Sequence, residues 1–335
     1  MADSTPRREP TSAAAPSNTA PRQTEPAKTP LNERHPPADP ASTGRARRAW
    51  RDRMVVIGFL LPALLVYTVF VLWPILNSFY FSTLDWNGIG VPVQVGLANF
   101  AELVTDRAAW EALWHNIILI AASLVFELPI GLALALLLLA PLRGTKVMRT
   151  IYFLPLLMST VAIGILWASI YNPTFGAVNR LLEVIGLEAL TQPWLGQPST
   201  ALAAVIVVIC WQYIPFYMIL YRAGLTSIPE EVNEAAIVDG ASTGSRFRFV
   251  TLPLLRGTTR TAVLLSVIGS LRYFDLIWVM TRGNNGTEVL ATYMYGQAFS
   301  SRRLGYGSAV AVALFLVAMV IATLVLSRLR GAQEY

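Results

Sequence analysis

Six apolar runs in this sequence have about the length that an α-helix needs to cross the hydrocarbon core of a membrane, roughly 20 residues. A segment in that core must satisfy its backbone hydrogen bonds internally, so runs of this length predict helices. The chain is 54% hydrophobic and only 14% charged, which is unlike an ordinary soluble domain. We therefore predict an all-α integral membrane protein with six transmembrane helices. The predicted spans cover residues 54–76, 116–140, 150–171, 200–221, 259–281 and 307–327.

Arginine and lysine residues are unevenly divided between the two ends of these spans. They cluster before the first span, in the second and fourth connections and after the last span, and they are sparse in the other connections. Because basic residues are retained on the cytoplasmic side of a membrane, both termini are predicted to be cytoplasmic. Short clusters beside apolar runs do not form the basic stripe of a nucleic-acid-binding protein. Membrane lipid is therefore an expected partner and nucleic acid is not.

Residues 1–48 differ in composition from the rest of the chain. They are rich in proline, serine, threonine, alanine and arginine, and they contain no apolar run that could build a core. We predict a disordered cytoplasmic tail at 1–48, with a docking segment for a partner as the alternative, and a transmembrane domain at 49–335. The chain has one cysteine and two histidines, so no disulfide, metal site or cofactor is expected.

The connection at 222–258 lies on the predicted cytoplasmic side and contains signals for two short helices. Ser227 and Glu230 have the spacing of a capping box that starts a helix near Ile228. Gly240 can take the left-handed conformation that ends this helix. A second helix is predicted to begin near Ser242 and to stop at a proline. Asp239 opposes the helix dipole in the last turn, so it is expected to have a partner.

The same connection carries a motif. It reads Glu234-Ala-Ala-Ile-Val-Asp-Gly-Ala241, then Phe247, then Val250-Thr-Leu-Pro253, and it resembles the EAA loop of ABC importer permeases. In that family this loop enters a cleft on the ATPase subunit. The resemblance implies a type I ABC importer permease fold for 49–335 and a bacterial cytoplasmic membrane location. It implies ATPase-coupling roles for Glu234, Ala235, Asp239, Gly240 and Pro253.

Other segments resemble the carbohydrate-uptake type of these permeases, in particular the first permease of maltose-, lactose- and glycerol-3-phosphate-type systems. They are Leu60-Leu-Pro-Ala63, Gly96-Leu-Ala-Asn-Phe100, Asn172-Pro-Thr-Phe-Gly176 and Phe274-Asp275. One segment departs from the pattern. After Thr281 the family usually has a run of glycines ending in proline, whereas this chain has Arg282-Gly-Asn-Asn-Gly286.

The resemblance also implies partners. They are a second permease subunit, an ATP-binding subunit dimer and an extracytoplasmic solute-binding protein. The chain has no Gly-x-x-x-x-Gly-Lys-Ser/Thr motif that could cradle a nucleotide phosphate, so ATP hydrolysis is expected on a separate subunit and this chain is not expected to be an enzyme.

Polar groups inside the spans are candidates for the solute path, because they are costly in lipid and tend to face cavities or one another. Arg272 and Asp275 are three residues apart, a spacing that allows them to contact either each other or a solute. Glu127 is expected either to hydrogen-bond a neighbouring helix or to line the path. The maltose-type pattern implies that solute contacts are made by Thr160, Gln212, Tyr213, Phe216, Ser266, Gly269, Ser270 and Tyr273.

These features predict a permease subunit of an ATP-driven importer for a sugar or related polyol. One alternative is an ABC permease for a non-sugar solute such as a polyamine. Another is a stand-alone ion-coupled transporter, which would be expected to show repeated halves with broken helices and would not need an ATPase-docking loop.

Overall fold

The computed structural model describes residues 40–139 and 145–330. Positions 1–39 of the predicted tail lie outside this described part. The chain separates into two compact units, residues 1–63 and 64–335. The described residues of the first unit belong to helix α1, Pro40–Tyr67, which begins before the predicted domain boundary at residue 48.

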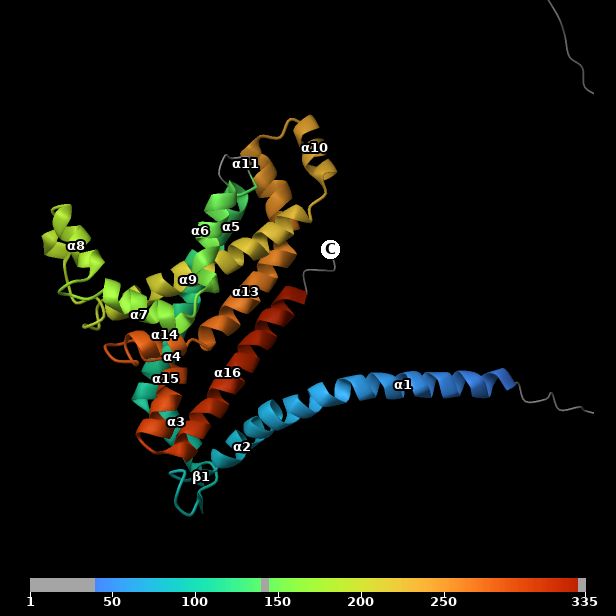
Figure 1. Ribbon diagram of the computed structural model, residues 1–335, viewed down its shortest axis with the longest axis vertical. Helices are drawn as coiled ribbons and strands as arrows, with labels where there is room; N and C mark the ends of the chain where they lie inside the picture. The colour runs from blue at the N-terminus through green and yellow to red at the C-terminus, as the bar shows by residue number, and fades with distance from the viewer. Residues whose placement is uncertain (1–39, 140–144, 331–335) are drawn as a thin grey trace, which may run out of the picture. The chain divides into compact units, whose positions relative to one another are not determined.

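The second unit is built almost entirely of helices (Figure 1). Its α-helices up to the middle of the chain are α2 (Trp73–Phe81), α3 (Ala98–Thr105), α4 (Arg107–Ala122), α5 (Leu128–Leu137), α6 (Thr145–Leu157), α7 (Thr160–Ile170), α8 (Ala177–Val184) and α9 (Ala201–Thr226). The later ones are α10 (Glu230–Val238), α11 (Thr243–Arg246), α12 (Leu252–Leu254), α13 (Arg256–Leu271), α14 (Asp275–Met280), α15 (Leu290–Tyr295) and α16 (Leu304–Arg330).

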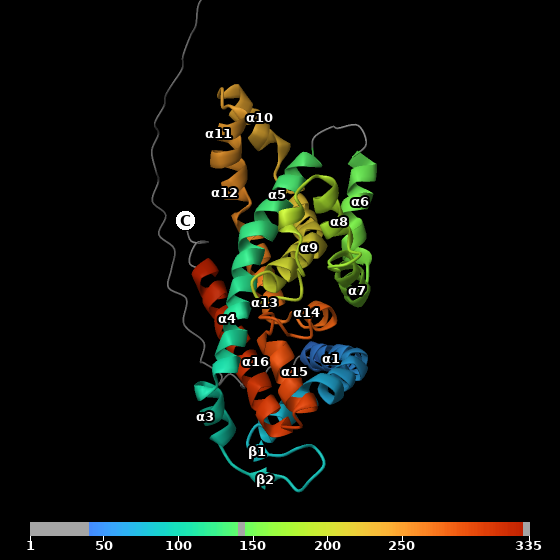
Figure 2. The ribbon, with the colours of Figure 1, turned by 90° about the vertical axis from the view of Figure 1, so that its left-hand side faces the viewer.

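Shorter elements join these helices. Single π-helical turns are η1 (Thr68–Leu72), η2 (Ser123–Glu127), η4 (Phe247–Thr251) and η5 (Gly296–Ser300), and η3 (Glu188–Leu190) is a 3₁₀ turn. Strands β1 (Leu84–Asp85) and β2 (Val93–Gln94) form an antiparallel pair, with Leu84 opposite Gln94 and Asp85 opposite Val93. The two views of the second unit place this hairpin and α10 at opposite ends of the helices, which we call the hairpin end and the α10 end (Figures 1 and 2).

Four helical stretches in the described part are long and apolar enough to cross a membrane unbroken. They are Met54–Phe81, Arg107–Leu137, Ala201–Thr226 and Leu304–Ser327. Each contains most or all of a predicted span, and the second starts earlier than predicted because Asp106 caps α4 at its N-terminus. Continuous apolar helices therefore lie where the sequence predicts these four spans, and the differences are mainly at their ends.

The other two predicted spans are not continuous helices. Over 150–171 the chain bends by 106° between Leu157 and Thr160, after a proline inside α6 that removes a helical hydrogen bond. Over 259–281 the helix stops at Leu271 and resumes at Asp275. No proline marks this second break. Its residues border a cavity described below, and non-helical backbone at membrane depth is tolerated where it lines a cavity.

The centre of the second unit is the packing of α5 along α9. A Cβ added to Gly131 on α5 would lie 2.8 Å from Cβ of Tyr217 on α9, so only glycine permits this approach. The core around the contact also includes Leu128, Met218 and Leu255, which are all buried. Close approach through a small residue is a common way for helices to associate in membranes.

At the hairpin end, one carboxylate joins three helices. Asp106 accepts a hydrogen bond from the backbone N–H of Ala108 at the start of α4, 2.9 Å long, and hydrogen bonds from the hydroxyls of Tyr293 on α15 and Tyr306 on α16. Burial opposes ionisation of Asp106, but these hydrogen bonds outweigh it and hold the pKa of the carboxyl below its ordinary value. The ionised carboxylate is therefore the form that holds the helix ends together.

We predict that Asp106→Ala lowers the unfolding temperature of the purified protein, because losing the helix cap alone costs about 1 kcal/mol. Since the pKa of Asp106 is depressed on folding, its contribution is fully present above the ordinary carboxyl pKa and is lost as the pH falls through the folded value. Thermal unfolding followed from about pH 7 to about pH 3 should show the gap between wild type and variant closing in acid. A gap that does not change with pH would contradict this role.

Candidate functional site

The connection between α9 and α13 forms a two-helix elbow at the α10 end. α10 ends at Val238, and two residues later Gly240 has a φ of 78°, the left-handed conformation expected from the sequence. Ser242 then caps α11, with its hydroxyl accepting a hydrogen bond from the backbone N–H of Ser245 at 3.3 Å. The helix, glycine and capped second helix are therefore in the predicted order.

Three details of this connection differ from the prediction. The capping box is absent, because the Ser227 hydroxyl donates to the carbonyl of Gly224 at 2.8 Å and α10 begins later, at Glu230. Pro253 does not stop the second helix but lies half-buried in α12, from which the chain continues into α13. The expected partner of Asp239 is not found among the described residues, and Asp239 lies exposed at the end of α10.

The predicted coupling residues do not all lie on one surface. Glu234, Ala235, Asp239 and Gly240 are all exposed, and Glu234 also lines a cavity of about 780 Å³ between α10, the end of α5 and α11, whereas Pro253 is half-buried in α12. The elbow also exposes apolar side chains that the sequence analysis did not select. Val238 is 87% exposed and Phe249 is 70% exposed. Exposed apolar groups beside a polar rim are typical of a protein–protein contact, so these two belong to the candidate docking surface.

A second candidate site is a cavity of about 360 Å³ between the helices. It is lined from α6, α9, α13 and the break between α13 and α14. Two tyrosines form much of its aromatic wall, with the rings of Tyr213 and Tyr273 5.5 Å apart. The lining residues are Leu156, Tyr213, Phe216, Tyr217, Leu265, Gly269, Arg272, Tyr273 and Asp275.

Four of the predicted solute-path residues line this cavity, namely Tyr213, Phe216, Gly269 and Tyr273. The other four do not.

The amide of Gln212 donates to the hydroxyl of Thr160 at 3.1 Å and so links α9 to the start of α7. Ser270 donates to the carbonyl of Ser266 at 2.8 Å, and its hydroxyl lies 3.2 Å from that of Ser123 in η2. These serines are buried in a helix contact behind the cavity wall.

Arg272 and Asp275 both line the cavity, on either side of the break in the predicted fifth span. They form no ion pair with each other, and the ion pairs of the described residues are Arg107–Glu111, Arg180–Glu183 and Glu102–Arg303. This structure therefore does not show the alternative, an ion pair between Arg272 and Asp275 that only orders the helix end. Both charged groups are available to a molecule in the cavity.

Glu127 lies behind the tyrosines. It ends the π-helical turn η2, is fully buried, and neither carboxyl oxygen has a hydrogen-bond partner among the described residues. Ser123 and Tyr273 are the polar side chains that interact with it. π-helical turns often occur at functional sites, and a buried polar group without a partner is expensive. Glu127 is therefore placed to support the cavity wall through Tyr273.

A helical membrane protein with a polar and aromatic cavity between its helices, and an exposed two-helix elbow at one end, has the architecture of a solute permease subunit. The chain belongs to a family of such proteins. Residues 127–332 match the family described as binding-protein-dependent transport system inner membrane component.

Curated relatives cover most of the chain. It is 38% identical over 274 residues to a probable ABC transporter permease protein of Pyrococcus horikoshii, a match covering 81% of this chain and 94% of the relative. It is 33% identical over 273 residues to the trehalose/maltose transport system permease protein MalF of Thermococcus litoralis, covering 80% and 91%. It is 32% identical over 320 residues to the diacetylchitobiose uptake system permease protein NgcF of Streptomyces coelicolor, covering 88% and 90%.

A solved structure shares the fold. A chain of a bacterial ABC transporter involved in the import of the acidic polysaccharide alginate superimposes with a TM-score of 0.75 at 24% identity, covering 86% of this chain and 100% of that one. The fold is therefore that of a helical ABC transporter permease. Together with the family match, this identifies the chain as an ABC transporter permease subunit.

We predict that Glu127→Leu reduces solute uptake at least tenfold, whereas Glu127→Gln keeps much of it, because glutamine preserves the shape and the polar character of the side chain beside Ser123 and Tyr273. The measurement is uptake rate against solute concentration at equal membrane abundance of each variant. Equal uptake by the Leu variant and wild type would show that Glu127 does not support the cavity wall. Equal loss in both variants would show that hydrogen bonding by an uncharged group is not sufficient.

Proposed function

We propose that this chain is one of two permease subunits of an ATP-driven importer that moves a sugar or related polyol across the cytoplasmic membrane of a bacterium. In this proposal it spans the membrane six times with both termini in the cytoplasm, and residues 49–335 form the permease domain behind the cytoplasmic tail 1–48. The observation that carries the proposal is the tyrosine-lined cavity within a chain of this family.

The cavity chemistry favours a sugar. Tyrosine rings offer faces for the C–H patches of a sugar ring, and their hydroxyls hydrogen-bond its hydroxyl groups. Several relatives are named for sugar transport, including the trehalose/maltose and diacetylchitobiose permeases above. A polyamine would require several acidic groups, whereas Asp275 is the one carboxylate that lines the cavity and Arg272 lies in the same lining.

The exposed elbow is proposed to dock on an ATPase subunit. Gly240 sets the angle between α10 and α11, Asp239 and Val238 lie exposed beside it, and Glu234 is exposed at the rim of the neighbouring cavity. Ala235 and Pro253 complete the proposed coupling set. Because one chain offers one elbow and an ATPase dimer offers two clefts, the assembly is proposed to contain a second permease. An extracytoplasmic binding protein would deliver the solute.

We predict that Gly240→Val keeps normal membrane abundance but loses uptake and solute-stimulated ATP hydrolysis. A β-branched residue in the left-handed conformation costs about 1–2 kcal/mol, and relieving that strain changes the angle between the helices. Abundance, co-purified ATPase and uptake are measured together in the complete transporter. Gly244→Val is the matched control, because Gly244 lies in the same elbow without a left-handed backbone or a close neighbour. Full uptake with normal ATPase retention in Gly240→Val would show that this elbow is not the coupling element.

We predict that Tyr273→Ala raises the KM for solute uptake roughly tenfold, because it removes an aromatic face worth on the order of 1 kcal/mol beyond its buried area. Tyr273→Phe should lie between the Ala variant and wild type. Gln212→Ala changes a predicted path residue whose amide bonds Thr160 and which does not line the cavity, so its effect on KM should be smaller. Unchanged KM and rate in Tyr273→Ala would remove this cavity from the solute path.

A further inference from the structure

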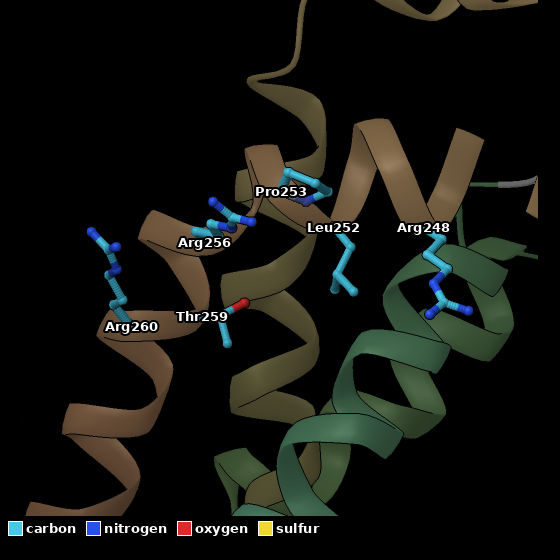
Figure 3. Close-up of a pocket in the computed structure, with 6 residues that line it drawn as sticks. All are labelled: Arg248, Leu252, Pro253, Arg256, Thr259 and Arg260. Atoms are coloured by element: carbon cyan, nitrogen blue, oxygen red, sulfur yellow. The ribbon is translucent and has the colours of Figure 1, made fainter. Parts of the chain in front are cut away.

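Three arginines surround a cavity of about 300 Å³ at the α10 end (Figure 3). Arg248 comes from η4, and Arg256 and Arg260 come from the first turns of α13. The remaining lining residues are Leu252, Pro253 and Thr259. This cavity is separate from the tyrosine-lined cavity, and the two share no lining residue.

The positive charge of this cavity has no compensation within the described part of the chain. None of the ion pairs found there involves Arg248, Arg256 or Arg260. Arg248 instead lies over the ring of Phe249, 5.7 Å from its centre. The positive-inside rule requires arginines on this side of a membrane, but it does not require three of them to line one cavity without an acidic partner.

The positions of Arg256 and Arg260 make this uncompensated positive charge still less favourable. Arg256 and Arg260 are four residues apart on α13, where like charges repel each other. Both lie near the N-terminus of that helix, whose dipole already disfavours cations, and no side chain caps that end. The lining therefore carries three positive charges beside a helix N-terminus, spread along the cavity with Arg248 and Arg260 at its two sides, and an anion would reduce their repulsion.

The walls of the cavity narrow the choice of anion. Leu252 and Pro253 are apolar, and the stems of the arginines are aliphatic, so the charged groups surround an apolar surface. A free phosphate gains nothing from such a surface. An amphipathic anion matches both parts, because its phosphate can accept hydrogen bonds from guanidinium groups while its apolar part contacts the aliphatic wall.

We propose that this cavity binds the phosphate headgroup of an anionic phospholipid of the cytoplasmic leaflet. The proposal rests on the proposed orientation of the chain, which places the α10 end at that leaflet. Arg256, Arg260 and Arg248 pair with the phosphate, and the hydroxyl of Thr259 is a further donor in the lining. Because the cavity joins η4 and α12 to α13, the bound lipid fastens the end of the ATPase-docking elbow to the membrane.

The test uses the complete purified transporter in nanodiscs of phosphatidylcholine with or without phosphatidylglycerol. Retained lipid is counted by native mass spectrometry in wild type and in the double variant Arg256→Gln and Arg260→Gln. Wild type should retain phosphatidylglycerol in preference to phosphatidylcholine. The double variant should retain at least roughly tenfold less phosphatidylglycerol than wild type, because each basic group near an anionic lipid contributes to binding. The control Arg222→Gln removes a cation at the end of α9 that does not line the cavity, and it should retain the lipid.

Several outcomes would overturn the lipid site. They are no preference for phosphatidylglycerol in wild type, equal retention in the double variant, and displacement of the lipid by millimolar inorganic phosphate, which would indicate a site for the free anion. Loss of the ATPase subunits from the double variant in phosphatidylcholine alone would show that the arginines serve a protein contact instead. Lipid retention is read without transport, so wild type that retains lipid but imports no sugar would count against the proposed function and not against this site.

Discussion

No water reaches the hydrocarbon core of a membrane, so each backbone amide there needs a partner within the protein, and this condition decides where the chain can leave a helix. The described part has two such departures inside predicted spans, at Ser159 and at Arg272–Phe274. The second borders the tyrosine-lined cavity through Arg272 and Tyr273, and the first follows α6, whose residue Leu156 lines the same cavity. The breaks in the helices therefore lie at or next to the cavity, whereas the continuous stretches Met54–Phe81 and Arg107–Leu137 each include one π-helical turn and no break.

The fold was predictable where a local signal decides the local structure. Apolar length locates the four continuous spans, and the glycine and serine of the elbow specify a left-handed residue and a helix cap at Gly240 and Ser242. The break after Leu271 lacks the usual helix breakers, since neither glycine nor proline occupies 272–274, which read Arg-Tyr-Phe. It depends on neighbouring helices that sequence reasoning cannot place.

The site was predictable only in part, because the direction of a side chain depends on the rotation of its helix. Successive residues of a helix point about 100° apart. On α13, Leu265 and Gly269 line the cavity while their neighbours Ser266 and Ser270 are buried behind it. A family pattern places a residue on the right helix turn, yet packing decides whether it faces the solute. The exposure of Val238 was missed for another reason, because valine is ordinarily assigned to a core.

Asp106 gathers the ends of α4, α15 and α16 at one carboxylate, and Arg303 adds a pairing with Glu102 beside it at 2.6 Å. Elements fastened to a single point cannot slide past one another at that point. The hairpin ends of α4, α15 and α16 therefore keep their places relative to one another, while the opposite ends of α4 and α16 lie outside this restraint.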